Sequence, residues 1–522
     1  MALLSFLPFL GFVNLFDWDE INFAEAAREM IVSGNYSTVT IDFKPFWEKP
    51  PLFFWMQVLS MKLFGINEFA ARFPNAIAGV LTLLTFFEVG NKLKGKPFGL
   101  IWSLLYLCSV LPHLYFKSGI IDPWFNLFIF LGVLSTYFYL NNRNGKLLFV
   151  SGLLIGLAIL TKGPVALLIY GLTALVYFIF NKFKGFPSLF HILLFFVGLI
   201  SFGGIWIITE TLQGRFYIIQ EFFEYQIRLL QTQDAGHGGP FYYHFLILLL
   251  GCFPLSAFAI PVLARKSNSQ KELFGFVMKV LFWVVLILFS LVKTKIVHYS
   301  SLCYFPLSYL AAIGAIEFTT SLKDKFYKVN IIALFTFWII ALFALAFVGN
   351  NLDFLIENFA IKDKFVVDAI NYPTPFSSFD YLPSVLLLIG LLLFFIYKEN
   401  IRKLTITLSF SYFAFMLCFA LVVPKIERFS QGGATDFYQN HIGDVVYPIG
   451  FKSYAHLFYT QKPKFSNENL HEVSSALSNN FDFPIYFITK VQKAKKIELN
   501  HPELEKISSD RGFVFYVKKP LK

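Results

Sequence analysis

The stretch DWDEINFAEAAREMIVSGNYSTVTIDFKPFWEKPPL, residues 17–52, is a charged island between the apolar residues 1–16 and a long apolar chain. Its acidic side chains are Asp17, Asp19, Glu20, Glu25, Glu29, Asp42 and Glu48, and its only cations are Arg28, Lys44 and Lys49. Placing ionisable groups at the edge of a membrane costs free energy, so an acidic patch beside a hydrophobic segment of a basic protein indicates a functional role. We therefore expect chemistry to reside in this island.

The composition is that of a membrane protein. Over 522 residues, 56% are hydrophobic and only 15% are charged, with a mean hydropathy of +0.61. An ordinary soluble domain carries about 25% charged residues. The net charge of +11 would also suit a nucleic-acid partner, but the lysines and arginines are scattered in short loops between apolar runs. Cys108, Cys252, Cys303 and Cys418 each stand alone, so neither a disulfide framework nor a thiolate zinc site is supported.

Apolar runs long enough to cross a bilayer, about 20 helical residues each, recur along most of the chain. We expect spans at 1–16, 70–90, 97–115, 120–140, 147–161, 164–180, 189–208, 241–263, 273–292, 299–317, 329–349, 380–397 and 403–423, thirteen in all. Residues 1–16 lack a basic start and a cleavage motif, which favours a first transmembrane helix over a signal peptide. Because they reach only about 24 Å at 1.5 Å per residue, the true start is expected upstream of Met1.

Positive charges fall on alternate loops. These cations are Lys92, Lys94, Lys96, Arg143, Lys146, Lys182, Lys184, Arg265, Lys266, Lys271, Lys323, Lys325, Lys328, Lys398, Arg402 and Lys403, against only Glu272, Asp324 and Glu399. Cytoplasmic loops carry such an excess, so the other loops are expected to face outward together with the island. An odd number of spans then places the amino terminus in the cytoplasm and the carboxy terminus outside.

The expected fold is an all-α polytopic membrane protein with a small carboxy-terminal α/β domain. Residues 1–423 would form the transmembrane domain, including the outer loop 17–52 and the outward loops 210–240 and 350–380. The first of these outward loops has helix-like apolar spacing around Phe222, Tyr225 and Leu229. Residues 424–522 would form the extracytoplasmic domain, with strands at 444–451, 484–489 and 512–518 and a helix at 468–479.

Ionisable residues on the outward side suggest a shared site. The set comprises Asp19, Glu20, Lys117, Asp122, Lys162, Lys293, Lys295, His298 and Tyr299. Any one of them could simply extend its polar end to the membrane interface. Taken together, anions from the first loop facing cations from later loops favour one common site.

The chemistry of such a site follows from its residue types. Cations at the outer leaflet suit a lipid-linked phosphate, because they stabilise the negative charge of a departing phosphate as it develops. A nearby carboxylate can take a proton from an incoming hydroxyl. Glycosyl transfer from a polyprenyl phosphate needs both. The sequence has no P-loop, G-x-S-x-G or H-E-x-x-H motif and no basic stripe for nucleic acid.

Six stretches carry a family resemblance. They are DWDEINFAEAAREMIVSGNY, FWEKPPLFFW, IIDPWF, LTKGP, HGGPFYYH and KTKIVHYSSLCYFPLSYLA, in this order along the chain. They resemble the C-type (GT-C) membrane glycosyltransferases related to aminoarabinose transferase and protein O-mannosyltransferase, which depend on dolichyl- or undecaprenyl-phosphate sugars. The resemblance covers most of the membrane portion, and the carboxy-terminal tail is similar only in kind. It implies the GT-C fold, a polyprenyl-phosphate sugar donor and a lipid or glycan acceptor.

The resemblance also implies site residues. Asp19 and Asp122 would be catalytic, Lys49, Lys162, Arg228 and Tyr299 would bind the donor phosphate, and Glu20, Asn22, Glu48, His237, Lys293 and His298 would line the cavity. Glu48 and His237 could meet a divalent metal, although two residues are too few to argue for zinc. Where aminoarabinose transferases read D-E-x-R-Y-A-E, this chain has Asn22 in place of the cation. Aminoarabinose as the sugar and lipid A as the acceptor are therefore not implied.

The expected activity is transfer of a hexose or pentose to a lipid, glycan or protein acceptor at the outer face of the cytoplasmic membrane. Two alternatives remain open at this point. A transporter or flippase of lipid-linked saccharides would need ionisable residues near the bilayer midplane and repeated broken helices. A ligase or polymerase of lipid-linked glycans would use a pyrophosphate donor in a similar cavity. No nucleic-acid partner is expected.

Overall fold

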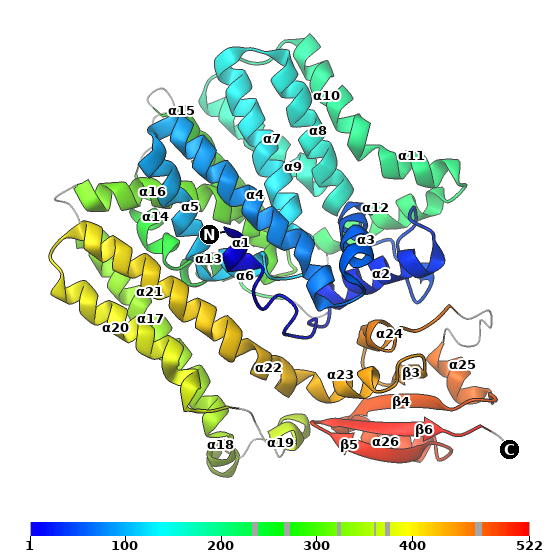
Figure 1. The fold of residues 1–522 in the computed structure, drawn as a ribbon. Coiled ribbons are helices and arrows are strands. Elements are labelled where there is room, and N and C mark those ends of the chain that lie inside the picture. The colour runs from blue at the N-terminus through cyan, green and yellow to red at the C-terminus, as the bar shows by residue number, and fades with distance from the viewer. Residues whose placement is uncertain are drawn as a thin grey trace.

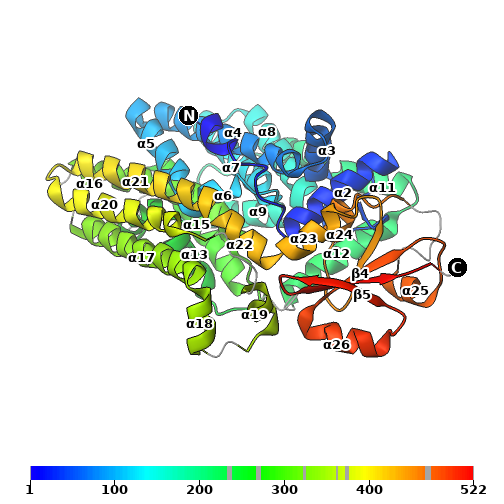
Figure 2. The same cartoon turned by 60° about the horizontal axis from the view of Figure 1, so that its bottom comes forward.

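The computed structural model describes residues 2–231, 238–265, 272–320, 325–359, 362–370, 376–464 and 472–520. Helices make up a large body, and a mixed helix and strand part follows at the carboxy terminus (Figure 1). Turning the molecule shows the sheet of this part below the amino-terminal helices (Figure 2). The structure thus has the expected all-α membrane architecture with a small carboxy-terminal α/β part.

The first expected span is wrong. Within residues 2–18 only α1 (Ala2–Phe6) is helical, and the following residues form turns and irregular chain. Phe9 adopts a left-handed φ of 61°, which an α-helix cannot accommodate. The guanidinium of Arg72 donates hydrogen bonds to the carbonyls of Leu10, Val13 and Asn14, at 3.0, 2.6 and 3.1 Å. These carbonyls are therefore satisfied by a side chain, and a helix is not needed to pair them.

The acidic island folds into two helices joined by a short hairpin. Its elements are α2 (Asp19–Ser33), β1 (Thr40–Ile41), β2 (Lys44–Pro45) and α3 (Leu52–Phe64). Asp19 and Glu20 occupy the first turn of α2, where negative charge is favoured by the helix dipole. Gly34 ends α2 in the left-handed conformation, φ 70°, that glycine adopts most easily.

The helical body contains most of the expected spans. Its main helices are α4 (Glu68–Lys94), α5 (Lys96–Leu107), α6 (Val110–Tyr115), α7 (Asp122–Asn142), α8 (Gly145–Lys162), α9 (Val165–Phe180), α10 (Leu189–Gly203), α11 (Ile205–Leu212), α13 (Tyr243–Gly251), α14 (Leu255–Leu263), α15 (Leu273–Leu291), η1 (Val297–Cys303), α16 (Tyr304–Thr320), α17 (Lys325–Asn350), α20 (Leu382–Ile396) and α21 (Asn400–Leu421). Among the described residues, eight helices are long and apolar enough to cross a membrane, or nine with the α10–α11 pair, which bends by 51°. The count of thirteen is not confirmed. The span expected at 1–16 is absent from the described residues 2–16, those at 97–115 and 241–263 are each divided between two shorter helices, and α9 has only 16 residues.

Glycines allow α8 and α10 to pack closely. A Cβ atom on Gly152 would lie 2.0 Å from the carbonyl oxygen of Phe195, and one on Gly198 would lie 2.3 Å from that of Phe149. Small residues are enriched where transmembrane helices approach in this way. The glycines therefore set the position of α8, whose last residue is Lys162.

The two outward loops also contain helices. The helix expected around Phe222 and Tyr225 is α12 (Phe216–Gln231), which packs Ile218, Ile219 and Phe222 against Trp206. The loop 350–380 contains α18 (Leu352–Phe359), α19 (Lys364–Ile370) and η2 (Ser378–Tyr381). Asp368 of α19 accepts a hydrogen bond from the Gly512 backbone N–H at 2.9 Å, so this loop contacts the carboxy-terminal part beside the sheet.

The carboxy-terminal part is a four-stranded sheet with helices. Its elements are α22 (Val423–Ser430), α23 (Gly432–Gln439), β3 (Val445–Pro448), α24 (Ala455–Tyr459), α25 (Val473–Ser478), β4 (Ile485–Lys490), α26 (Val491–Asn500), β5 (Glu505–Asp510) and β6 (Phe513–Lys518). The strand order is β3-β4-β6-β5, with β3 parallel to β4 and the other pairs antiparallel. The three expected strands are present. The sequence did not predict β5, a mostly exposed edge strand without apolar alternation, or the helices α24 and α26.

A buried ionic cluster joins the island to the carboxy-terminal part. Arg28 donates to both oxygens of Glu25 at 2.7 and 2.6 Å and to the carbonyl of Lys462 at 3.0 Å. The Lys462 ammonium donates to Asp42 at 2.7 Å. Burial and the charge of Glu25 raise the pKa of Glu29 well above its ordinary value, which favours its protonated form. The cluster holds α2 against α24.

We expect the pair of Arg72 and Glu20 to be a main source of stability. Their side chains are 5% and 6% exposed and lie 2.8 Å apart. Arg72→Met should cost about 3–5 kcal/mol, because it leaves the Glu20 carboxylate buried without its cation. The thermal unfolding midpoint of the purified protein measures this loss.

The matched control is Arg402→Met, which breaks an exposed pair with Glu399 at 2.8 Å, with side chains 56% and 60% exposed. That change should cost less than about 1 kcal/mol. Equal shifts of the two midpoints would contradict the structural importance of Arg72.

Candidate functional site

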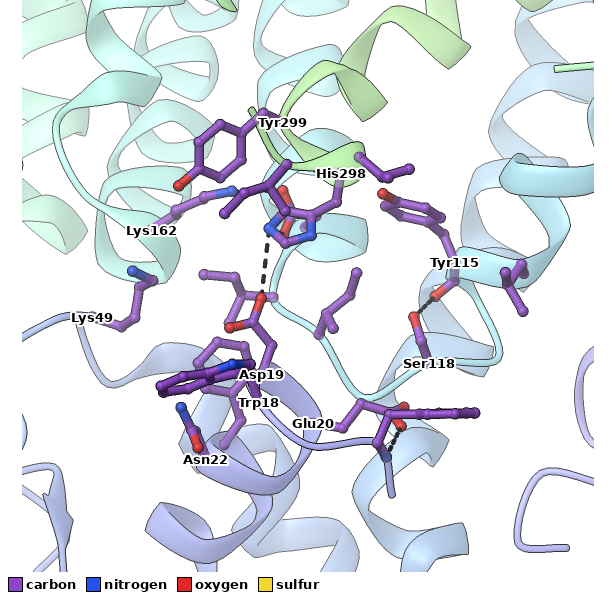
Figure 3. A pocket seen from close by; sticks show the side chains of 18 of the residues that line it. Trp18, Asp19, Glu20, Asn22, Lys49, Tyr115, Ser118, Lys162, His298 and Tyr299 are labelled. Carbon is purple, nitrogen blue, oxygen red and sulfur yellow. Dashed lines mark hydrogen bonds and ion pairs between the residues drawn. The ribbon is translucent and has the colours of Figure 1, made fainter. Parts of the chain in front are cut away.

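A cavity of about 1410 Å³ lies where the island meets the helical body and the carboxy-terminal part. It exceeds the roughly 300–1,000 Å³ of ordinary small-molecule pockets. Much of its polar lining comes from helix ends and loops, and Figure 3 shows the labelled side chains around it. A cavity of this size has room for an amphiphile as well as a small polar group.

Four ionisable residues form a continuous string across the cavity. The Lys162 ammonium donates to Asp122 Oδ1 at 2.6 Å. His298 Nε2 lies 3.9 Å from Asp122 Oδ2 and 3.5 Å from Asp19 Oδ2, the contact drawn as a dashed line in Figure 3. The side chain of Asp122 is 3% exposed, whereas that of Asp19 is 40% exposed. Asp19 is therefore the carboxylate of the pair that is open to a ligand.

Helix ends bring these four residues together. Asp19 begins α2 and Asp122 begins α7, so both carboxylates lie at helix amino termini, where the dipole favours negative charge. Lys162 ends α8, where the dipole favours a cation, and Gly163 and Pro164 stop that helix. His298 comes from the 3₁₀ turn η1.

Cations and aromatic rings form one wall of the cavity. The Lys49 ammonium lies 5.4 Å from the centroid of the Tyr225 ring, and the Arg228 guanidinium lies 5.2 Å from the same ring. Lys162 lies 5.1 Å from the ring of Tyr299. Such cation–π contacts hold the positive groups in place beside the cavity. This wall is suited to an anion such as a phosphate.

The surroundings of Lys49 make its charged form less stable than that of an exposed lysine. Burial lowers the pKa of Lys49 from its ordinary value, and the carboxylates of Glu48 and Asp19 offset only part of this effect. Glu48 itself accepts a hydrogen bond from the Tyr225 hydroxyl at 3.3 Å. An anion bound beside Lys49 would favour its charged form.

The structure brings most of the expected site residues together. Those that line the cavity are Asp19, Glu20, Asn22, Glu48, Lys49, Asp122, Lys162, Arg228, His298 and Tyr299. Lys293 is exposed and is not among the lining residues. His237 lies outside the described residues. In the part of the chain that the structure describes, no three histidines, cysteines or carboxylates are grouped as metal ligands.

Glu20 lines the cavity as expected and also has a structural role. Its carboxylate accepts hydrogen bonds from Arg72 at 2.8 and 2.9 Å, from the Phe16 N–H at 3.0 Å and from the Gly119 N–H at 2.5 Å. Burial alone would raise the pKa of Glu20, but Arg72 and the backbone donors outweigh it and lower that pKa. Glu20 is thus an ionised structural anchor whose oxygens are already occupied.

Three further residues at the cavity were not predicted. Lys452 and Tyr454 come from the carboxy-terminal part, and Trp18 precedes α2. The Lys452 ammonium lies 5.1 Å from the Trp18 ring and 5.4 Å from the Tyr454 ring. The only sequence signal was the place of Trp18 between Asp17 and Asp19, because the docking of the carboxy-terminal part depends on tertiary structure.

Two sets of helices contribute to the apolar lining. Val165, Leu168 and Ile227 belong to α9 and α12, whereas Met416 and Phe419 belong to α21. In both views α9 and α12 lie apart from α21 (Figures 1 and 2). The polar string is therefore accompanied by apolar surface from different sides of the molecule.

We expect Asp122 and Lys162 to depend on each other for stability. Asp122→Asn or Lys162→Met should each cost about 2 kcal/mol, because each leaves one largely buried charge without its partner. The double variant should cost less than the sum of the two single changes. Thermal unfolding midpoints of the four proteins complete this cycle, and strictly additive losses would show that the 2.6 Å contact carries no coupling.

Comparison with known proteins agrees with the resemblance. Residues 48–207 match the family described as dolichyl-phosphate-mannose-protein mannosyltransferase. The curated undecaprenyl phosphate-alpha-4-amino-4-deoxy-L-arabinose arabinosyl transferase of Aeromonas hydrophila is 27% identical over 325 residues, 60% of this chain and 58% of that protein. The enzyme of the same name from Wigglesworthia glossinidia brevipalpis is 28% identical over 335 residues, 63% of this chain and 59% of that protein. The matches thus span less than two thirds of these relatives.

A solved structure shows the same fold over nearly the whole chain. ArnT from Cupriavidus metallidurans in the apo state has a TM-score of 0.78 at 16% identity, covering 99% of this chain and 96% of that one. The same protein bound to undecaprenyl phosphate gives a TM-score of 0.76 at 17% identity, with the same coverage. The GT-C fold expected from the motifs is confirmed. The eight long apolar helices among the described residues, together with these relatives, indicate a multi-pass protein of the cytoplasmic membrane.

Proposed function

We propose that this protein is a glycosyltransferase that moves a sugar from an undecaprenyl-phosphate carrier to a lipid or glycan acceptor. The observation that carries the proposal is the placement of an open carboxylate, Asp19, beside the cationic wall of one large cavity. The names of the curated relatives, which are undecaprenyl-phosphate-dependent arabinosyl transferases, support the donor class. A protein hydroxyl is a less favoured acceptor, because much of the cavity lining is apolar.

The reaction would be a single displacement with inversion at the anomeric carbon. The acceptor oxygen forms a bond to that carbon while the bond between the carbon and the phosphate oxygen breaks. The electron pair of the broken bond stays with the undecaprenyl phosphate, and the proton of the acceptor hydroxyl passes to a carboxylate. The site must therefore bind a phosphate that gains charge and offer a base on the acceptor side.

The residues of the cavity divide between these two tasks. Lys49, Lys162 and Arg228, together with the Tyr299 hydroxyl, would hold the departing phosphate. Asp19 would accept the proton, and His298, whose Nε2 lies 3.5 Å from Asp19 Oδ2, would orient that carboxylate. If the acceptor group is itself a phosphate, no base is needed and Asp19 would only position it. Asp122 would act mainly on His298 and Lys162.

The cavity is proposed to open at the outer face of the membrane. Residues 424–522 contribute Lys452 and Tyr454 to its lining, so this part would lie on the same outer side as the island. We propose residues 1–423 as the transmembrane domain and 424–522 as the extracytoplasmic domain. The cytoplasmic placement of the amino terminus depended on a first span that the structure does not contain, so it is not proposed.

The direct test is transfer by variants in membranes supplied with labelled polyprenyl-phosphate sugars. Asp19→Asn should lower kcat by about 10²–10⁴-fold, the usual contribution of a general base. Lys49→Ala should mainly raise KM for the donor. The matched control is Lys146→Ala, an exposed lysine at the opposite end of the helix that carries Lys162. Undiminished transfer by both site variants would refute the proposal.

Donor binding should weaken at alkaline pH. Burial lowers the pKa of Lys49 below its ordinary 10.5. The side chain is therefore charged at pH values below this lowered pKa, and it loses its charge as the pH rises through the lowered pKa. Affinity for undecaprenyl phosphate should therefore fall at a lower pH than an exposed lysine would allow. Equilibrium binding between about pH 8 and 10.5 avoids the second ionisation of the phosphate near pH 6.

The control for this pH dependence is Lys49→Arg. Arginine stays charged throughout the range, so the decline should flatten while binding near neutral pH is largely kept. An equally steep decline in this variant would assign the pH dependence to another group.

A further inference from the structure

Asn22 presents a buried amide to the cavity without a full set of partners. It lies one helical turn after Asp19 on α2, lines the cavity and is 5% exposed. Among the described residues, its side-chain oxygen has no hydrogen-bond partner. Such a group costs about 1–3 kcal/mol when it is left unpaired. The oxygen itself is shielded, but the residue lines the cavity, and rotation about the last side-chain bond would let the amide offer its oxygen or its nitrogen to a ligand there.

Other buried amides in the molecule serve the fold. The Gln57 and Asn75 oxygens are also unpaired among the described residues, but neither residue lines the cavity. The Gln57 nitrogen donates to the Ala71 carbonyl at 2.9 Å, and the Asn75 nitrogen donates to the carbonyls of Ser118 and Ile120 at 2.6 Å. These amides tie helices and turns together. Asn22 is distinguished by its place at the cavity.

The surroundings of Asn22 indicate which part of a ligand it would meet. Side chains three positions apart on a helix are neighbours at about 5–6 Å, so Asn22 adjoins Asp19, the proposed base. Figure 3 shows Asn22 and Lys49 on the same side of Asp19, away from Glu20. The part of the donor that connects the phosphate to the reacting acceptor is the sugar ring. Asn22 therefore lies where that ring would be held.

Trp18 adds a second feature suited to a sugar. Its side chain lines the same cavity and is 39% exposed. The C–H face of a sugar ring packs well against such an aromatic surface, and its hydroxyls then point to the side. An amide beside the ring offers both hydrogen-bond donors and an acceptor, and a hydroxyl can pair with either.

We propose that Asn22 is a specificity-determining residue that hydrogen-bonds a hydroxyl group of the transferred sugar. The inference rests on the proposed function and narrows its substrate to donors with a neutral hydroxyl at the position facing α2. The amide carries no charge, so it provides no counterion for an ionised amine or carboxylate of a sugar. The choice of sugar would thus be made on α2, next to the proposed base.

The experiment measures binding of three probes to the purified full chain in lipid nanodiscs. The probes are undecaprenyl phosphate alone, undecaprenyl phosphate-mannose and undecaprenyl phosphate-4-amino-4-deoxy-L-arabinose. Asn22→Leu removes the amide at similar volume. It should weaken binding of the neutral-sugar donor about tenfold, the effect of one lost hydrogen bond with an unpaired group. Binding of the sugar-free carrier should change less than about twofold, within the error of such differences.

Stability separates a ligand contact from a structural one. Asn22→Leu removes an unpaired buried polar atom, so the ligand-free protein should unfold at the same temperature or a higher one. Asn22→Ser keeps a hydroxyl and should show an intermediate loss of donor affinity. Gln57→Leu, which removes a buried amide outside the cavity, is the matched control and should leave the relative affinities for the three probes unchanged.

Each other outcome overturns the inference. An equal loss for the carrier and the glycosylated donors would place Asn22 against the phosphate. Unchanged affinities, or a wild-type protein that binds mannose and aminoarabinose donors no better than the carrier, would mean that the amide recognises no sugar. Failure of the proposed function is different, because then neither the carrier nor any donor would bind.

Discussion

The ion pair between Glu20 and Arg72 sets the position of the whole site. Arg72 of α4 holds the irregular chain before α2 through the carbonyls of Leu10, Val13 and Asn14. Glu20 also accepts a hydrogen bond from Gly119, three residues before Asp122. One buried carboxylate thereby links the start of α2, the helix α4 and the turn that enters α7. The two proposed acidic residues, Asp19 and Asp122, face each other across His298 because this anchor fixes both of their helices.

Much of the membrane part could be predicted from the sequence because bilayer insertion leaves a strong signal. The long apolar runs form α4, α7, α15 and α17. The polar motifs between apolar runs contain Asp19, Lys49, Asp122 and Lys162, which line one cavity. Residues 1–16 were equally apolar but do not form a span. Hydropathy could not predict this, because it does not show that a buried arginine donates hydrogen bonds to the backbone carbonyls of this segment. Glu20 lines the cavity as expected, but its structural role could not be predicted from the sequence, because its partner Arg72 is 52 positions away.

The carboxy-terminal part was harder to read. Strands with apolar alternation, such as β4 and β6, were visible, whereas β5 is an exposed polar edge and α26 is rich in lysine. Local pattern detects a core-facing element and misses one that packs only at its margin. The contribution of Lys452 to the cavity could not be read from spacing, because it depends on how a separate sheet docks onto α2 and Trp18.

The buried cluster at that docking surface has a consequence for how the protein can change. Arg28 and Asp42 of the island find partners in the carbonyl and the ammonium of Lys462, which is 1% exposed. A chain cut before the sheet would leave these groups facing lipid headgroups or water with their matching partners gone. The carboxy-terminal part is therefore not expected to fold separately from the rest of the chain. The two parts are expected to unfold in one transition, and substitutions on one side of the contact are expected to be compensated on the other. A chimera that takes its carboxy-terminal part from a distant relative should fold only when residues 25–42 are exchanged together with that part.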